Sequence, residues 1–176
     1  MAHTTDGARV GVIMGSESDL PAMLPAIKIL EELGIVWEVN ALSAHRTPGD
    51  VAEYAGALAA RGVQVVIAGA GGAAHLPGVI AAMTPLPVIG VPIKSTALDG
   101  LDSLLAIVQM PPGVPVATVG VNAAQNAGIL AVQIIGAGDP EVRRRVQAFK
   151  DELASKVRRR NAGLPERVAS EVNRGE

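Results

Sequence analysis

The sequence predicts an α/β protein in which helices cover both faces of a parallel β-sheet, and two observations support this. Short β-branched runs alternate with longer helical patterns through five rounds, each joined by a short loop marked by Gly or Pro. Hydrophobic residues make up 49% of the 176 residues and are mostly Ala, Val, Ile and Leu. Small aliphatic side chains of this kind suit a sheet that closely packed helices bury on both faces.

The first strand and the first helix are marked by a β-branched run and a capping pattern. The run at 9–14 favours a strand and leads into a turn. Ser16 and Asp19 have the spacing of a capping box, so the helix should begin here and stop at Gly34. Pro25 lies inside the helical pattern and predicts a kink or a late start.

The later elements follow the same alternation. Further strands are expected at 35–42, 63–68, 87–93 and 114–121. The run at 63–68 is continuously apolar, as expected for a strand that is covered on both faces. Pro48 begins the second helix in the first-turn position, where proline is tolerated. The helices after the first are expected to end near Gly62, Met83, Gln109 and Ile135.

The segment after Gly136-Ala137-Gly138 differs in composition from the rest. Residues 139–161 are highly charged and helical in pattern, and Asp139-Pro140 is a good helix start. We therefore expect a flexible N-terminus at 1–8 and a single α/β domain at 9–160. This domain would include the C-terminal helix from about residue 140, followed by a tail at 161–176.

Composition excludes several classes of function. A formal net charge of −2 gives no basic surface for nucleic acid or an anionic membrane, and 2% aromatic residues give few platforms on which bases could stack. The absence of Cys rules out disulfides and thiolate metal sites, and no zinc-binding spacing, P-loop or nucleophile elbow is present. No apolar run approaches the ~20 residues of a membrane span, and the N-terminus lacks a signal-peptide pattern. We expect a cytoplasmic protein that holds no metal.

Three consecutive strands are expected to end in polar or glycine-rich loops, at 15–19, 43–48 and 69–78. In an open α/β sheet, ligands bind beyond the carboxyl ends of the strands, near the point where strand order reverses. The first loop offers the hydroxyls of Ser16 and Ser18 and the free N–H groups of a helix start, which together suit a phosphate. Asp19 could bind sugar hydroxyls, but helix capping explains these residues more simply.

The second loop concentrates polar chemistry that is scarce elsewhere in the chain. His45 stands beside Arg46, with the hydroxyls of Ser43 and Thr47 on either side. An Arg is a natural partner for a phosphate or a carboxylate, and a His with an ordinary pKa near ~6.5 can give and take protons at neutral pH. We favour a functional role for His45. For His75, which follows the glycine run of the third loop, the residues favour neither a structural nor a catalytic role over the other.

The third loop has a competing interpretation. Gly69, Gly71 and Ala74 match the dinucleotide fingerprint G-x-G-x-x-A, which suggests NAD. The fingerprint usually follows the first strand, however, and the acidic residue expected about 20 positions later is absent at Ile93-Lys94. The run at 71–74 better fits backbone placed close to a flat ligand, and tight strand-to-helix packing explains its glycines equally well.

Taken together, the three loops resemble a known family. The motifs MGSESD, SAHRTP and AGAGGAAHLPG, in this order and spacing, are similar to those of the N5-carboxyaminoimidazole ribonucleotide mutases of purine biosynthesis (class I PurE). The similarity continues at 90–92, 98–105 and 108–111 and covers roughly residues 9–136. It implies a flavodoxin-like, three-layer α/β/α sandwich with a five-stranded parallel sheet and an added C-terminal helix. It also implies a homo-octamer with sites near subunit boundaries.

The resemblance also implies a reaction and roles for residues. The family moves a carboxylate from the exocyclic amine to a ring carbon of an aminoimidazole ribonucleotide and needs no metal or organic cofactor. His45 would transfer the proton and His75 would line or orient the site. The residues implied to hold the phosphate are Ser16, Ser18 and Arg46, with Asp19 on the ribose. Those implied to line the imidazole and carboxylate pocket are Ser43, Ala44 and the loop from Gly71 to Leu76, with Gly72, Ala73, Ala74 and His75 between them.

Three alternatives remain at this stage. A related class in the same fold carboxylates aminoimidazole ribonucleotide directly with carbon dioxide, although SAHR and GGAAHLPG both follow the mutase pattern. A second alternative is a nucleotide-binding module that uses Gly69-Ala70-Gly71. The third is a non-catalytic assembly protein in which these loops are only structural.

Overall fold

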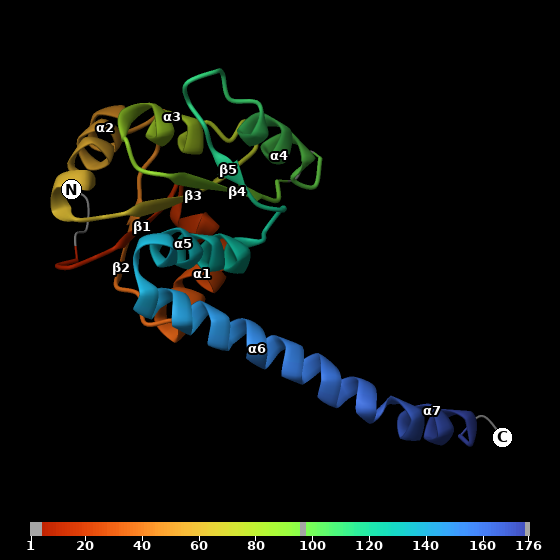
Figure 1. Cartoon of the computed structure of the whole chain (residues 1–176). Coiled ribbons are helices and arrows are strands. Elements are labelled where there is room, and N and C mark those ends of the chain that lie inside the picture. Colours follow the sequence, from red (N-terminus) through yellow and green to blue (C-terminus); the bar gives the residue numbers. More distant parts are fainter. Residues whose placement is uncertain (1–4, 96–97, 175–176) are drawn as a thin grey trace.

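A five-stranded parallel sheet with the strand order β2-β1-β3-β4-β5 forms the middle layer of the computed structural model, which describes residues 5–95 and 98–174 (Figure 1). The strands are β1 (Val10–Met14), β2 (Trp37–Ala41), β3 (Val65–Gly71), β4 (Val88–Ile93) and β5 (Ala117–Thr118). All neighbouring strands pair in parallel, and Val12 of β1 stands between Val39 of β2 and Ile67 of β3. The predicted flavodoxin-like α/β sandwich is confirmed.

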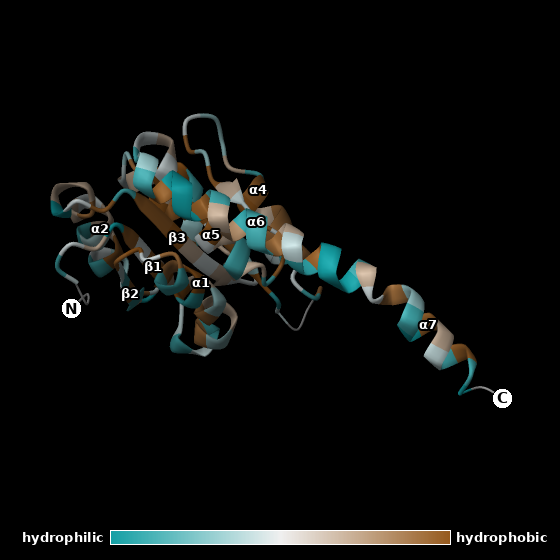
Figure 2. Ribbon diagram, turned by 60° about the horizontal axis from the view of Figure 1, so that its bottom comes forward, coloured by the Kyte–Doolittle hydropathy of each residue, from teal (hydrophilic) through white to brown (hydrophobic). Residues whose placement is uncertain are grey.

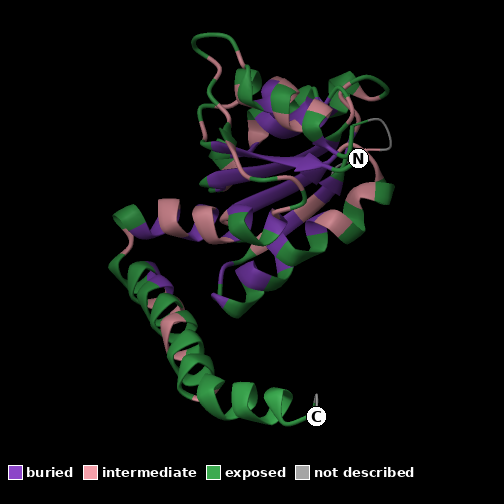
Figure 3. Cartoon of the chain, turned by 90° about the vertical axis from the view of Figure 1, so that its right-hand side faces the viewer, coloured by how far each residue is buried: buried purple, intermediate pink, exposed green. Residues whose placement is uncertain are grey.

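Two layers of helices cover the sheet (Figure 1). One face packs on α1 (Leu20–Glu32) and α5 (Ala124–Gly138), and the other packs on α2 (Pro48–Ala57), α3 (Leu76–Met83) and α4 (Leu101–Val108). Each face has its own hydrophobic core, and Figure 3 shows the buried strands lying between the two helix layers. Burial on both faces explains why β1 and β4 are entirely apolar or glycine and fully buried.

Close approach of helices to the sheet depends on strand glycines. A Cβ at Gly69 in β3 would collide with the sulfur of Met23 from α1. A Cβ at Gly90 in β4 would lie 2.5 Å from a methyl carbon of Ile107 in α4. Interiors packed to this density leave no room for an added methyl group, so these glycines set the distance between the layers.

The fifth strand is much shorter than predicted. A strand over 114–121 was expected, but β5 has only two residues and pairs only with Ile89 and Gly90 of β4. It lies at the edge of the sheet, and Pro115 and Pro92 have no N–H to extend the ladder. Beyond β5, isolated backbone hydrogen bonds hold the chain beside β4. One runs from the Asn122 N–H to the Pro92 carbonyl at 2.8 Å.

The first helix begins after a short 3-10 turn. This turn spans Glu17–Asp19, and the Ser16 hydroxyl caps it by accepting the Ser18 N–H at 3.3 Å. The α-helical part then starts late, at Leu20, and Pro25 lies inside it. The missing N–H of Pro25 would otherwise bond a carbonyl in the first turn, so its loss costs little of the later helix.

The C-terminal helices leave the domain (Figure 1). Asp139 caps α6 (Pro140–Ala162) by accepting the N–H groups of Glu141 and Val142, and α7 (Leu164–Val172) follows. The first part of α6 buries its apolar side chains against the α1 and α5 layer. The same stripe continues exposed into α7, where Figure 2 shows hydrophobic and hydrophilic segments alternating. Its exposed members are Leu153, Val157, Leu164, Val168 and Val172.

The predicted flexible N-terminus falls only partly within the described residues. Residues 1–4 lie outside them, whereas the Thr5 N–H donates to the Glu38 carboxylate at 3.2 Å and Ala8 is buried. The proposed division into N-terminus, domain and tail stays a prediction. Over the ranges 5–95 and 98–174, no helix is long and apolar enough to cross a membrane.

Candidate active site

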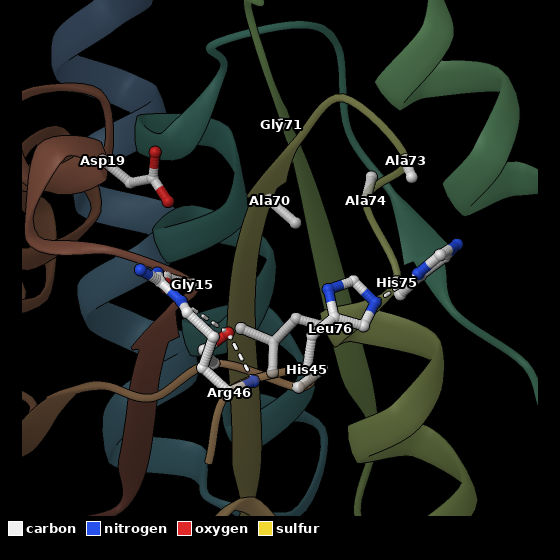
Figure 4. A pocket seen from close by; sticks show the side chains of 12 residues that line it. Gly15, Asp19, His45, Arg46, Ala70, Gly71, Ala73, Ala74, His75 and Leu76 are labelled. Atoms are coloured by element: carbon white, nitrogen blue, oxygen red, sulfur yellow. Dashed lines mark hydrogen bonds between the residues drawn. The ribbon is translucent and has the colours of Figure 1, made fainter. Parts of the chain in front are cut away.

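A cavity of about 450 Å³ opens at the carboxyl edge of the sheet, where the three predicted loops meet (Figure 4). The loops come together because β1 lies between β2 and β3, so their carboxyl ends are neighbours at the reversal of strand order. The cavity is lined by Gly15, Asp19, Ser43, Ala44, His45, Arg46, Ala70, Gly71, Ala73, Ala74, His75 and Leu76.

The first loop brings a carboxylate to the cavity wall. Asp19 lines the cavity, and burial raises the pKa of its carboxyl group, while the backbone N–H groups of Ser16 and Gly15 act in the opposite direction. The Ser18 hydroxyl donates to the Ser16 hydroxyl at 2.9 Å. Both serines lie on the same turn as Asp19 but outside the set of lining residues. This turn therefore offers one acceptor inside the cavity and two hydroxyls beside it.

The second loop is closed on itself and holds an unpaired guanidinium. Thr47 accepts the Ser43 N–H at 3.0 Å, and its own N–H donates to the Ser43 carbonyl at 2.9 Å. Arg46 donates weakly to the Ser43 hydroxyl and to the Gly15 carbonyl, both at 3.4 Å. The Arg46 side chain is exposed and forms no ion pair with any residue in the described part of the chain. Its charge is available to an anionic ligand.

The third loop presents backbone and small side chains to the cavity. Gly72 and Ala74 both have positive φ, at 61° and 46°, and the Ala74 N–H closes the turn on the Gly71 carbonyl at 3.1 Å. A non-glycine residue in this region is strained, and such residues cluster at functional sites. Of the predicted loop residues, Gly72 does not line the cavity, whereas the others do: Gly71, Ala73, Ala74, His75 and Leu76.

The dinucleotide interpretation of this loop does not fit the structure. Gly69 lies inside β3, where its missing Cβ makes room for Met23, and not at the turn. α3 begins only at Leu76, so the glycines do not place a helix N-terminus on a pyrophosphate as the fingerprint requires. Packing of α1 on the sheet explains Gly69 instead.

The two histidines of the site form a hydrogen bond. Nε2 of His45 lies 2.6 Å from Nδ1 of His75, and the rings meet edge to face with centroids 4.8 Å apart and an interplanar angle of 87° (Figure 4). The sequence predicted that each histidine lies at a strand end. It did not predict the bond between them, because the two residues are 30 positions apart in the chain.

Sequence reasoning missed two lining residues, Gly15 and Ala70. Gly15 is the first residue after β1, and Ala70 is the second-last residue of β3. The signal that could have found them is this position alone, since their side chains carry no chemistry. Within the described residues, no group of three or more His, Cys, Asp or Glu side chains is arranged to hold a metal ion.

The fold and this three-loop cavity define an α/β protein with a small-molecule pocket at the carboxyl edge of a parallel sheet. Comparison with known families identifies it further. The model of the AIR carboxylase family matches residues 9–156, so the chain belongs to that family.

Individual relatives carry a more specific name. The chain is 58% identical over 174 residues to the N5-carboxyaminoimidazole ribonucleotide mutase of Mycobacterium tuberculosis, with 99% of each chain covered. It is 59% identical over 149 residues to the mutase of Thermotoga maritima, covering 85% of this chain and 87% of that protein. The crystal structure of Treponema denticola PurE superposes with a TM-score of 0.82 at 26% identity, over 88% of this chain and 97% of that one.

Proposed function

We propose that this protein interconverts N5-carboxyaminoimidazole ribonucleotide and 4-carboxyaminoimidazole ribonucleotide in purine biosynthesis. The proposal rests on one observation, the set of residues that line a single cavity. His45 and Arg46 share it with the Asp19 carboxylate and with a wall of glycine and alanine. A proton carrier, an anion anchor and a small, unreactive pocket are what a carboxylate migration requires.

The nucleotide end of the substrate would lie over the first two loops. Arg46 has no acidic partner among the described residues and would bind the phosphate, with the hydroxyls of Ser16 and Ser18 beside it. Asp19 would accept hydrogen bonds from the ribose hydroxyls. The phosphate would then lie beside the short turn at Glu17–Asp19 that leads into α1.

The imidazole end would lie between the second and third loops. Ser43 and Ala44 would face the ring from one side, with Gly71, Gly72, Ala73, His75 and Leu76 on the other. Small side chains here let the backbone approach a flat ring closely. A wall with few polar donors would also keep released carbon dioxide near the ring without binding it.

The chemistry needs one proton to move twice. The bond between the exocyclic nitrogen and the carboxylate breaks, carbon dioxide leaves, and the nitrogen receives a proton from His45. The ring carbon then attacks carbon dioxide, and the proton it loses returns to His45, so the enzyme ends in its starting state. Proton transfer and exclusion of water suffice for these steps, so we propose that no metal or organic cofactor takes part.

We infer that the protein acts as a homo-oligomer in the cytoplasm, an octamer by its resemblance to the family. Large apolar side chains are exposed on and before α4, where nothing in the described chain covers them. They are Leu98, Leu101, Leu105 and Val108. Native mass spectrometry tests the assembly: eight subunits are expected, and a monomer at micromolar concentration would overturn it.

A substrate assay tests the function and separates it from its runner-up. The second candidate is direct carboxylation of aminoimidazole ribonucleotide, which the description of the matched family as AIR carboxylase favours. Purified protein is given either N5-carboxyaminoimidazole ribonucleotide or aminoimidazole ribonucleotide with bicarbonate. We expect rapid turnover of the first and slow turnover of the second. The reverse preference would favour the carboxylase, and turnover of neither would overturn both.

A further inference from the structure

The hydrogen bond between the two site histidines assigns a role to the second one. We propose that His75 is a positioning residue that holds His45 in a single tautomer, with the proton of their shared bond on Nε2 of His45. This leaves Nδ1 of His45 as the nitrogen that gives and takes the proton during the reaction. The proposal rests on the proposed function only for its catalytic consequence, because the tautomer exists without substrate.

The bond itself allows only one proton between the rings. At 2.6 Å, either Nε2 of His45 donates to Nδ1 of His75 or the reverse, and two N–H groups facing one another would repel. An arrangement with a proton on both facing nitrogens is therefore disfavoured. The remaining question is which ring carries the shared proton.

The position of His75 answers this question. His75 is the N-cap residue of α3, an eight-residue helix, and its side chain makes no capping bond. The positive end of a helix dipole disfavours an added positive charge nearby. Of the two rings, His45 is therefore the better place for a positive charge. An imidazolium carries a proton on both nitrogens, so a charged His45 donates through Nε2 and Nδ1 of His75 accepts.

The geometry of His45 agrees with this assignment. Figure 4 shows the Nδ1 side of the His45 ring turned away from His75 and toward Ala70 in the middle of the cavity. With Nε2 bound to His75, Nδ1 is the nitrogen that a substrate in the cavity can reach. Arg46 and Asp19 are the other charged groups that line this cavity, and neither is hydrogen-bonded to either histidine ring within the described residues.

Both proton transfers of the reaction then use one atom, Nδ1 of His45. Protonated His45 gives its Nδ1 proton to the exocyclic nitrogen as the nitrogen–carboxylate bond breaks. The ring carbon later returns its proton to the same Nδ1 as the new carbon–carbon bond completes. The Nε2–H bond to His75 is unchanged throughout, so the ring is held in place while its charge appears and disappears.

Nitrogen NMR of the imidazole rings tests the tautomer directly. The chain has only three histidines, so 15N-histidine labelling gives a spectrum that can be assigned with single variants. In wild-type protein at alkaline pH, we expect His45 to carry its proton on Nε2, and His75 to have an unprotonated Nδ1. A proton found on Nδ1 of His75 would overturn the assignment.

Two variants of His75 separate the bond from the side chain's bulk. Asn places an acceptor oxygen near the position of Nδ1, whereas Leu fills the space without any acceptor. We expect His75→Leu to lower kcat roughly tenfold with KM changed by less than about threefold, since a general base that is held wrongly loses part of its effect. His75→Asn should restore kcat to within about threefold of wild type and keep the Nε2–H tautomer of His45.

The outcomes distinguish this inference from the proposed function. An active wild type with unchanged kcat and an unchanged His45 spectrum in His75→Leu would overturn the role of His75 and leave the mutase function standing. A wild type with no turnover would overturn the function, while the tautomer measurement would still support or overturn the histidine bond. Circular dichroism of both variants confirms folding, which the exposed position of His75 favours.

Discussion

Charged side chains lie at both ends of the parallel sheet, and the two ends hold them differently. At the amino end, Glu38 of β2 is 1% exposed and accepts hydrogen bonds from both terminal nitrogens of Arg61, at 2.6 and 2.9 Å. At the carboxyl end, Arg46 is exposed and touches neutral oxygens of Ser43 and Gly15 at 3.4 Å. One guanidinium is paired with a buried carboxylate within the protein, and the other is available to a ligand.

The amino end is a network of buried and partly buried polar groups. The Arg61 guanidinium lies 5.5 Å from the centre of the Tyr54 ring, and the Tyr54 side chain is buried. Burial, and next the nearby Glu38 carboxylate, raise the pKa of the Tyr54 hydroxyl. A buried ion pair of this kind specifies one arrangement, because removing either partner leaves the other charge unpaired. We therefore expect changes at the amino end to lower stability and changes at the carboxyl end to lower activity.

The largest expected effect is on turnover, from His45→Asn. The change removes the group that transfers protons in the proposed mechanism, while Asn keeps polarity and similar size. We expect kcat to fall by about 100-fold or more, with the melting temperature and ligand binding close to wild type. Steady-state kinetics and calorimetric titration with product measure the two effects. Unchanged turnover would remove His45 from the mechanism.

Glu38→Gln should show the opposite behaviour. It leaves Arg61 facing a neutral amide, and because Arg61 is partly exposed we expect a loss of roughly 2 kcal/mol in the free energy of unfolding. Per folded molecule, kcat should be unchanged. Urea denaturation measures the free energy of unfolding, and steady-state kinetics at one temperature measure kcat.

Glu53→Gln is the matched control for Glu38→Gln. Glu53 is exposed on α2, and the same chemical change there should stay within about 0.5 kcal/mol of wild type. Equal destabilisation by the two variants would show that the Glu38 ion pair adds nothing specific. A selective loss of kcat in Glu38→Gln would contradict the separation of the two ends.

These two ends also differ in how far the sequence predicts them. The carboxyl-end loops were predicted because polar residues follow apolar strands at recognisable places, and the sheet then brings those ends together. The burial of Glu38 was not predicted. A charged residue in a strand ordinarily faces water, and its partner Arg61 lies 23 residues away on a turn. Burial of a charge depends on a long-range partner that no local pattern reveals.

The shortened β5 and the histidine bond were missed for the same kind of reason. The run at 114–121 is apolar enough for a strand, but its pairing depends on which groups β4 can offer at the edge. His45 and His75 were each found at strand ends, while their 2.6 Å separation depends on the conformations of two loops. Element order follows from local sequence, whereas contacts between loops follow from the assembled fold.

Arg46→Gln should weaken binding more than catalysis. Its guanidinium is held by weak contacts and has no acidic partner among the described residues, so its main loss is the charge offered to the phosphate. We expect KM to rise roughly tenfold with kcat within about threefold, the pattern for loss of uniform binding. Arg46→Lys is the control and should recover only part of this, because Lys cannot form a bidentate pair. A fall in kcat with constant KM would instead place Arg46 in the proton-transfer step.

The smallest expected effect comes from a substitution inside the sheet that presses on the amino-end network. A Cβ at Gly11 in β1 would lie 2.7 Å from the Tyr54 hydroxyl oxygen, closer than the two atoms can pack. We expect Gly11→Ala to cost about 1 kcal/mol of unfolding free energy, since the ring must shift and disturb its neighbours. In a Tyr54→Phe background the hydroxyl is gone, so the same substitution should cost much less. A double-mutant cycle by urea denaturation measures this coupling. Additive effects would mean that Tyr54 yields freely and that the amino end is less rigid than its buried ion pair implies.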